Sequence, residues 1–211
     1  MAQRSRLASG AGLWSLVFVV VTLGQQWLPG AAEHWKFVRT AYGAGAWWQL
    51  LTAQAVHLST VHAGVNALGL VVLLLVFRGL VAGRLQALAL LGGYAGVALV
   101  LALDPDCVFY AGASGALHGL LAGSACALLL APPPRPLMPR ARLQILGGCV
   151  LLGLAAKLLV QHFGGYGSSP GWLGFATYYP AHEAGAVGGL VAVLLARMFQ
   201  RQAPARPGTG A

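Results

Sequence analysis

The chain has 211 residues, of which 58% are hydrophobic and only 8% are charged. A water-soluble domain carries about 25% charged residues, so this composition excludes an ordinary soluble globule and predicts a protein that lies in a lipid bilayer. The net charge is +9, but aromatic residues do not alternate with the basic ones as on a nucleic-acid-binding surface. We therefore expect no nucleic-acid partner.

Six apolar segments follow one another along the chain, each close to the roughly 20 residues that cross a bilayer as a helix. We place these spans near residues 11–28, 57–77, 84–103, 113–131, 142–162 and 181–199. They predict an all-α polytopic membrane protein with one domain over residues 1–200 and a disordered tail over 201–211. The first apolar run follows basic residues, as in a signal peptide, but it is longer than usual, so we interpret it as a membrane anchor.

Two connecting segments have distinctive compositions. Residues 29–56 are rich in tryptophan and are predicted to lie in the headgroup layer, where aromatic residues are favoured. Residues 131–140, with the sequence APPPRPLMPR, contain too much proline to be helical. We expect the second segment to be a cytoplasmic linker between spans four and five.

Basic residues are distributed unevenly between the two ends of the predicted spans. Most of them fall on one side of a six-span topology: Arg4, Arg6, Arg78, Arg84, Arg135, Arg140, Arg142, Arg197, Arg201 and Arg206. The acidic residues fall on or near the other side: Glu33, Asp104, Asp106 and Glu183. The positive-inside rule then places both termini in the cytoplasm and the first residues of spans two, four and six at the outer face.

Polar side chains gather at the outer ends of these three alternate spans. They are His57, His62 and Asn66 in span two, Ser114 and His118 in span four, and His182 in span six. Residues with unrelated structural roles have no reason to agree in depth. Because ionisable groups are costly in lipid and usually functional there, the agreement predicts one polar site below the outer surface.

Each of these residues also has an explanation that requires no site. A lone serine in a span commonly bonds its own helix backbone, and a neutral histidine can pack in a core. The four histidines could instead ligate zinc. However, the sequence has no HExxH motif, and Glu183 projects about 100° away from His182 around a helix. We therefore expect no metal and no cofactor.

Three motifs in these spans resemble those of the rhomboid intramembrane serine proteases over nearly the whole chain. They are H-x4-H-x3-N with His57, His62 and Asn66, G-x-S-G with Gly112, Ser114 and Gly115, and A-H-x2-G-x3-G with Ala181, His182, Gly185 and Gly189. Each motif alone is weak, but three in the right order on the right spans are specific. The resemblance implies a rhomboid-like bundle of six transmembrane helices.

The resemblance also implies roles for individual residues. Ser114 corresponds to the nucleophile and His182 to its base, while His62, Asn66 and the Ser114 backbone N–H correspond to the oxyanion hole. Gly112 and Gly115 would thin span four so that span six can approach. Since no carboxylate is placed to orient His182, we expect a Ser-His dyad.

His118 is expected to lie beneath His182 and to position its ring, because residues four apart share one face of a helix. A packing histidine with a single backbone bond is the alternative. His57 lies further up span two and is expected to bond a loop.

The sequence GASGALHG is similar to the signature of a narrower branch, the rhombosortases. That branch implies a secreted bacterial protein as substrate, anchored by a C-terminal tail with a Gly-Gly motif, a transmembrane helix and a basic cluster. It further implies the bacterial inner membrane, with the site open to the periplasm.

We expect the outer loop 163–180 to gate the entry of substrate from the lipid.

Two other functions stay open. A non-proteolytic rhomboid-like protein would bind membrane helices without cutting them, but such proteins usually lack the serine or the base. A transporter is disfavoured because no charged relay crosses the inner half of the spans.

The chain also departs from many rhomboids at Trp48-Gln49, where they have Trp-Arg, which leaves the conformation of that outer segment open.

Overall fold

The computed structural model describes residues 20–21, 23–135, 137–164 and 177–202. Most of the predicted first span, the middle of the outer loop 163–180 and the end of the tail lie outside these residues. The expectations of a membrane anchor, a gating loop and a disordered tail therefore stay predictions.

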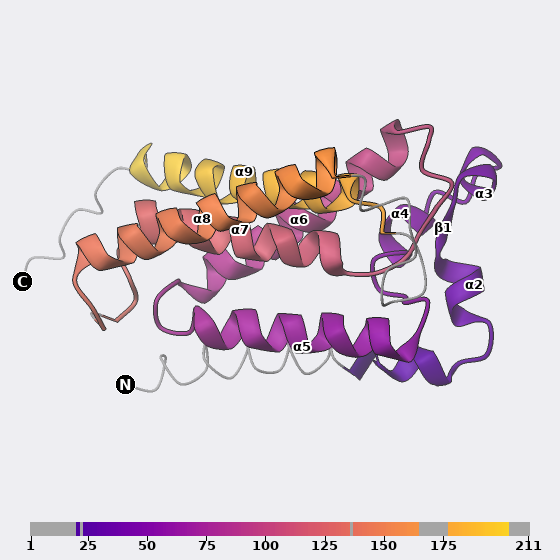
Figure 1. Cartoon of the computed structure of the whole chain (residues 1–211), viewed down its shortest axis with the longest axis horizontal. Helices are drawn as coiled ribbons and strands as arrows, with labels where there is room; N and C mark the ends of the chain where they lie inside the picture. The colour runs from indigo at the N-terminus through magenta and orange to yellow at the C-terminus, as the bar shows by residue number, and fades with distance from the viewer. Residues whose placement is uncertain (1–19, 22, 136, 165–176, 203–211) are drawn as a thin grey trace, which may run out of the picture.

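Five long helices cover the predicted spans between residues 57 and 199 (Figure 1). They are α5 (Thr60–Val76), α6 (Gly83–Leu103), α7 (Ser114–Leu130), α8 (Arg140–Phe163) and α9 (Pro180–Gln202). Within the described part of the chain, three of them, α6, α8 and α9, are long and apolar enough to cross a membrane. The other two are apolar but have only 17 residues each, at the short end of the range for a spanning helix. A polytopic helical membrane protein is supported, whereas the count of six spans stays a prediction.

The outer segment contains short elements that the sequence analysis did not predict. They are the 3-10 helix η1 (Gln25–Trp27), α2 (Ala31–Trp35), β1 (Phe37–Val38), α3 (Arg39–Gly43) and α4 (Gln49–Thr52). Strand β1 pairs antiparallel with β2 (Phe109–Tyr110), the two residues that precede the turn into α7. This pairing ties the outer segment to the start of the helix that carries Ser114.

Arg39 and Gln49 fasten the outer segment to the bundle. The Arg39 guanidinium donates to the carbonyl of Leu101 at 2.7 Å and to that of Asp104, both at the C-terminal end of α6. There its positive charge also complements the helix dipole. Gln49, which stands where many rhomboids have arginine, accepts a hydrogen bond from the Val38 backbone N–H at 3.0 Å. The segment is thus held without an arginine at position 49.

Asp104 links the end of α6 to the segment that leads into α9. The Tyr178 hydroxyl donates a hydrogen bond to the Asp104 carboxylate, and the Asp106 N–H donates a second one at 2.9 Å. These two bonds lower the pKa of Asp104 from its usual 3.8. The contact with Tyr178, four residues before His182, thus joins the start of α9 to the end of α6.

Glycines allow α6, α7 and α9 to pack backbone against backbone. A Cβ atom added to Gly119 of α7 would lie 2.7 Å from the Gly185 carbonyl oxygen of α9, and one on Gly93 of α6 would lie 2.7 Å from the Ala116 oxygen. Small residues permit this approach in lipid, where dispersion rather than burial from water drives association. By contrast, α5 packs more sparsely on α7, through Gly69 and Leu117, and Figure 1 shows it apart from the other four long helices.

We expect Gly185→Ala to destabilise the bundle by about 1–3 kcal/mol, the usual range for overpacking a close-packed core. Its new methyl group would overlap the Gly115 carbonyl, a backbone atom that cannot move aside alone. Thermal unfolding in detergent measures the effect. The matched control is Gly148→Ala on α8, where a Cβ meets no atom within 4 Å. Equal unfolding temperatures for the two variants would contradict the close contact between α7 and α9.

Candidate active site

A cavity of about 170 Å³ lies at the end of the bundle where α5, α7 and α9 begin. Its polar lining comes from α5, α7, α8, α9, the strand before α7 and the segment before α9: His62, Asn66, Tyr110, Ser114, Gln161, Thr177, Tyr178 and His182. Its apolar lining is Leu58, Val65, Phe109 and Ala111. Most of the residues that the sequence analysis placed at one depth therefore face one cavity.

Ser114 and His182 are in hydrogen-bond contact. The serine is the first residue of α7, and the histidine follows Pro180, the first residue of α9, where proline fits because the first turn has no N–H partner to lose. The Ser114 Oγ lies 2.9 Å from His182 Nε2. With the hydroxyl as donor and Nε2 as acceptor, the pair has the geometry in which an imidazole can take a serine proton.

Two glycines around Ser114 are required by space. Gly112 has φ +121°, which favours glycine, and a Cβ there would lie 2.6 Å from the His62 ring. A Cβ on Gly115 would lie 2.6 Å from the Ala181 carbonyl oxygen. Gly112 thus lets α5 approach the serine, and Gly115 lets α9 do so.

His118 lies one turn below Ser114 on α7 and stacks on His182. The two ring centroids are 4.2 Å apart, with an angle of 12° between the planes. His118 Nδ1 lies 2.7 Å from the Ser114 carbonyl oxygen, so it carries the proton and donates it. The two rings are thus stacked on one another, whereas the positioning role of His118 stays a prediction.

His62 and Asn66 present one face of α5 to the cavity, and both are buried. The Asn66 side-chain amide donates to the His62 carbonyl oxygen at 2.9 Å, and because an amide nitrogen has two hydrogens, one is left for another acceptor. Ser59 caps this helix by accepting from the His62 backbone N–H at 3.2 Å.

His57 precedes α5 instead of opening it. Its Nε2 accepts from the Ala113 backbone N–H at 3.4 Å, and its carbonyl accepts from the Gln26 side chain at 3.2 Å. The ring packs edge-on against His62, with centroids 4.8 Å apart. His57 therefore connects η1, the start of α5 and the turn before Ser114.

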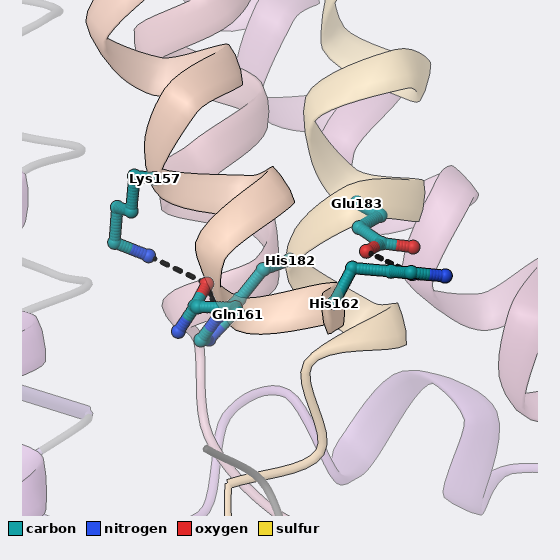
Figure 2. Close-up of polar contacts among 5 residues, drawn as sticks. All are labelled: Lys157, Gln161, His162, His182 and Glu183. Atoms are coloured by element: carbon teal, nitrogen blue, oxygen red, sulfur yellow. Dashed lines mark hydrogen bonds and ion pairs between the residues drawn. The ribbon is translucent and has the colours of Figure 1, made fainter. Parts of the chain in front are cut away.

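Two residues of α8 that the sequence analysis did not select also contact the histidines. Gln161 Oε1 lies 3.2 Å from His182 Nδ1 and 2.8 Å from Lys157 Nζ (Figure 2). Lys157 Nζ also lies 2.8 Å from His118 Nε2. One signal could have found them. Lys157 is a charged residue inside a predicted span, which is itself an indication of function, and Gln161 is one helical turn from it.

Glu183 points elsewhere, as its position next to His182 predicts. Its carboxylate lies 3.0 Å from His162 Nδ1, at the outer end of α8 (Figure 2). Among the described residues, no three His, Cys, Asp or Glu side chains are grouped so that they could hold a metal ion.

Comparison with protein-family models gives a match over most of the chain. The family model for the Rhomboid domain matches residues 44–199, which include α5 to α8 and all but the end of α9. No match was found among curated proteins or among solved structures.

Proposed function

Because the chain belongs to the rhomboid family of intramembrane serine proteases, we propose that Ser114 is its nucleophile and His182 the general base. The observation that carries this assignment is the 2.9 Å contact between Ser114 Oγ and His182 Nε2 at the wall of a cavity. A serine hydroxyl is a weak nucleophile until a base takes its proton. No other serine in the described residues has a hydrogen bond to a histidine ring.

The reaction proceeds in two steps, acylation of Ser114 and hydrolysis of the acyl-serine. His182 Nε2 takes the Ser114 proton while Oγ forms a bond to the scissile carbonyl carbon, and the imidazolium then gives that proton to the departing amine. In the second half, water loses a proton to His182 and its oxygen attacks the acyl-serine. The proton returns to Ser114 Oγ as the carboxylic acid leaves.

Donors for the tetrahedral oxyanion come from two helices. The Ser114 backbone N–H belongs to the first turn of α7, where helical N–H groups have no partner within the helix. We assign the other donors to the His62 ring and to the second Asn66 amide hydrogen. They act in a mostly buried site, where fixed donors stabilise developing charge best.

The substrate is proposed to be a secreted protein held by a C-terminal transmembrane helix and cut near a Gly-Gly motif. The sequence GASGALHG and the position of Ser114 at the first residue of α7 support this choice. The outer end of the substrate helix must unwind before its peptide bond can reach this serine. Glycine favours unwinding because it costs a helix about 1 kcal/mol relative to alanine.

The bacterial inner membrane, with the site open to the periplasm and the termini cytoplasmic, is the proposed location. Arg140 and Arg197 support this orientation, since their guanidinium groups donate to the Leu129 and Leu130 carbonyls at the end of α7 far from Ser114. Cationic side chains concentrate at the cytoplasmic ends of spans.

Reconstitution tests the function directly. The purified protein is placed in liposomes with a reporter that carries a Gly-Gly motif, an apolar span and a basic cluster. We expect the reporter domain to be released, and mass spectrometry to place the cut at the outer edge of its span. Tight binding of the reporter without release would instead favour a non-proteolytic helix-binding protein.

Asn66→Ala is expected to lower kcat about 100-fold or more with little change in KM, because an oxyanion donor acts mainly in the transition state. Steady-state kinetics in detergent measure both constants. Asn66→Asp retains the size but replaces the donor by a carboxylate, so it should be no better. A raised KM at normal kcat would assign Asn66 to substrate binding.

A further inference from the structure

Polar side chains of α8 form a chain of hydrogen bonds that reaches both histidines of the site. Lys157 lies at its centre, with Nζ bonded to His118 and to Gln161. Gln161 in turn contacts His182, and Figure 2 shows the part of the chain from Lys157 to His182. Apart from Lys157, Gln161 and the neighbouring His162, the outer half of α8 carries apolar side chains. Burying an amine or an amide in lipid costs free energy, and side chains that persist in spite of this cost usually mark a functional site.

The donors and acceptors around Gln161 agree with one arrangement. If His182 Nε2 accepts the Ser114 proton, the neutral ring carries its own proton on Nδ1. That N–H then donates to Gln161 Oε1 at 3.2 Å, and Lys157 donates to the same oxygen at 2.8 Å. Turning the amide over would place its NH₂ group against two donors. The side-chain orientation of Gln161 is therefore set by its partners.

The same logic holds on the His118 side. His118 Nδ1 donates to the Ser114 carbonyl at 2.7 Å, which leaves Nε2 as an acceptor, and Lys157 donates to it at 2.8 Å. The His118 ring is thus held at both nitrogens, and it supports the stacked His182 ring from below. Lys157 is the shared donor that connects the two supports.

We propose that Gln161 is the positioning residue of the base: it selects the Nδ1–H tautomer of His182 and holds Nε2 toward Ser114, and Lys157 fixes the Gln161 amide. This inference rests on the proposed roles of Ser114 and His182. It extends the expected Ser-His dyad by a third, neutral residue, which orients the histidine and takes no proton. An amide also orients the catalytic histidine in papain-like cysteine proteases, where the third residue is asparagine.

The pair His162–Glu183 shows what a contact between α8 and α9 looks like without this role. His162 follows Gln161 in sequence, and its ring meets Glu183 at 3.0 Å. Yet neither side chain lines the cavity, whereas Gln161 lines it beside Ser114 and His182. If Gln161 only joined α8 to α9, its amide would have no need to contact His182 Nδ1, the ring nitrogen opposite the one that contacts Ser114.

Three variants test the assignment of Gln161. Gln161→Leu removes the acceptor on a helix where leucine is common, Gln161→Glu keeps an acceptor oxygen, and Gln144→Leu is the matched control. Gln144 is on the same helix and bonds the Leu129 carbonyl far from the site. We expect Gln161→Leu to lower kcat about 10- to 100-fold with KM within about twofold. Gln161→Glu should recover part of this loss, because it retains the acceptor oxygen. Gln144→Leu should stay near wild type.

Two readouts do not depend on the substrate. The rate of Ser114 labelling by a fluorophosphonate probe should fall in Gln161→Leu and not in Gln144→Leu. Nitrogen-15 NMR of labelled histidine, with the His182 signals identified by their loss in His182→Ala, should show a protonated Nδ1 in wild type and a mixture of tautomers in Gln161→Leu. A purely structural role for Gln161 would not change this tautomer ratio.

The outcomes separate the two levels of inference. Normal labelling and an unchanged tautomer in folded Gln161→Leu would overturn the role of Gln161 and leave Ser114 as nucleophile. Wild-type protein that is not labelled at Ser114 would overturn the catalytic assignment and this inference with it. If Gln161→Leu unfolds at a lower temperature, Gln161→Ala takes its place, and the same labelling and NMR results decide.

Discussion

Ser114→Ala is expected to abolish cleavage of the reporter, with a loss of at least about 10⁴-fold in kcat, because no covalent acyl-enzyme can form. The helix should be unaffected, since alanine is the best helix former and a hydroxyl leaves almost no cavity. Fluorophosphonate labelling followed by mass spectrometry measures the loss directly. The wild type should carry the label on Ser114, and the variant should carry none.

The chain offers a matched control on the same helix. Ser124 is fully buried in α7, ten residues further along, and Ser124→Ala should retain both labelling and cleavage. Equal unfolding temperatures for the two variants would show that the fold is intact in each. Cleavage by Ser114→Ala at the wild-type rate would end the assignment of this serine, whatever the family of the chain.

Replacing the substrate's Gly-Gly by Leu-Leu is expected to stop its release and to leave the reporter in the membrane fraction. Two leucines stabilise the helix against unwinding by about 1 kcal/mol each relative to glycine, and the cavity of about 170 Å³ has little room for two large side chains beside the Ser114 hydroxyl. Release from liposomes, measured by immunoblot of the soluble fraction, gives the rate.

The control places the same Leu-Leu pair one turn deeper in the substrate span and retains the Gly-Gly motif. That reporter should be released normally, since its scissile region can still unwind. If the Leu-Leu variant at the motif were released as fast as the parent, the rhombosortase assignment would fail. Membership of the rhomboid family would be unaffected, because it rests on residues 44–199.

The sequence alone was sufficient for the class of protein and for the long helices. Long apolar runs are a local property, so residues 84–103 and 142–162 predicted α6 and α8 to within two residues at each end. The prediction of a rhomboid-type serine protease is confirmed by the family match. The rhombosortase branch, the six-span count and the roles of individual residues stay predictions.

Motif spacing also predicted which side chains share a helix face and which helices approach closely. Ser114 and His118 share a helix face because they are four residues apart, and the glycines of α7 and α9 predicted their close approach. The contact between Ser114 and His182 follows, since two helices that touch at Gly115 and Gly185 bring their first turns together.

Only the tertiary structure brought Gln161 to His182 and Lys157 to His118. These pairs are 21 and 39 residues apart in the sequence, and the rotation of α8 about its axis decides which of its side chains face the site. That rotation is set by packing, such as Gly147 against the Ala125 carbonyl, and a nearly uniform apolar helix carries no local pattern that reveals it. The pairing of β1 with β2 is of the same kind, because two-residue strands have no periodicity and form only where the bundle brings them together.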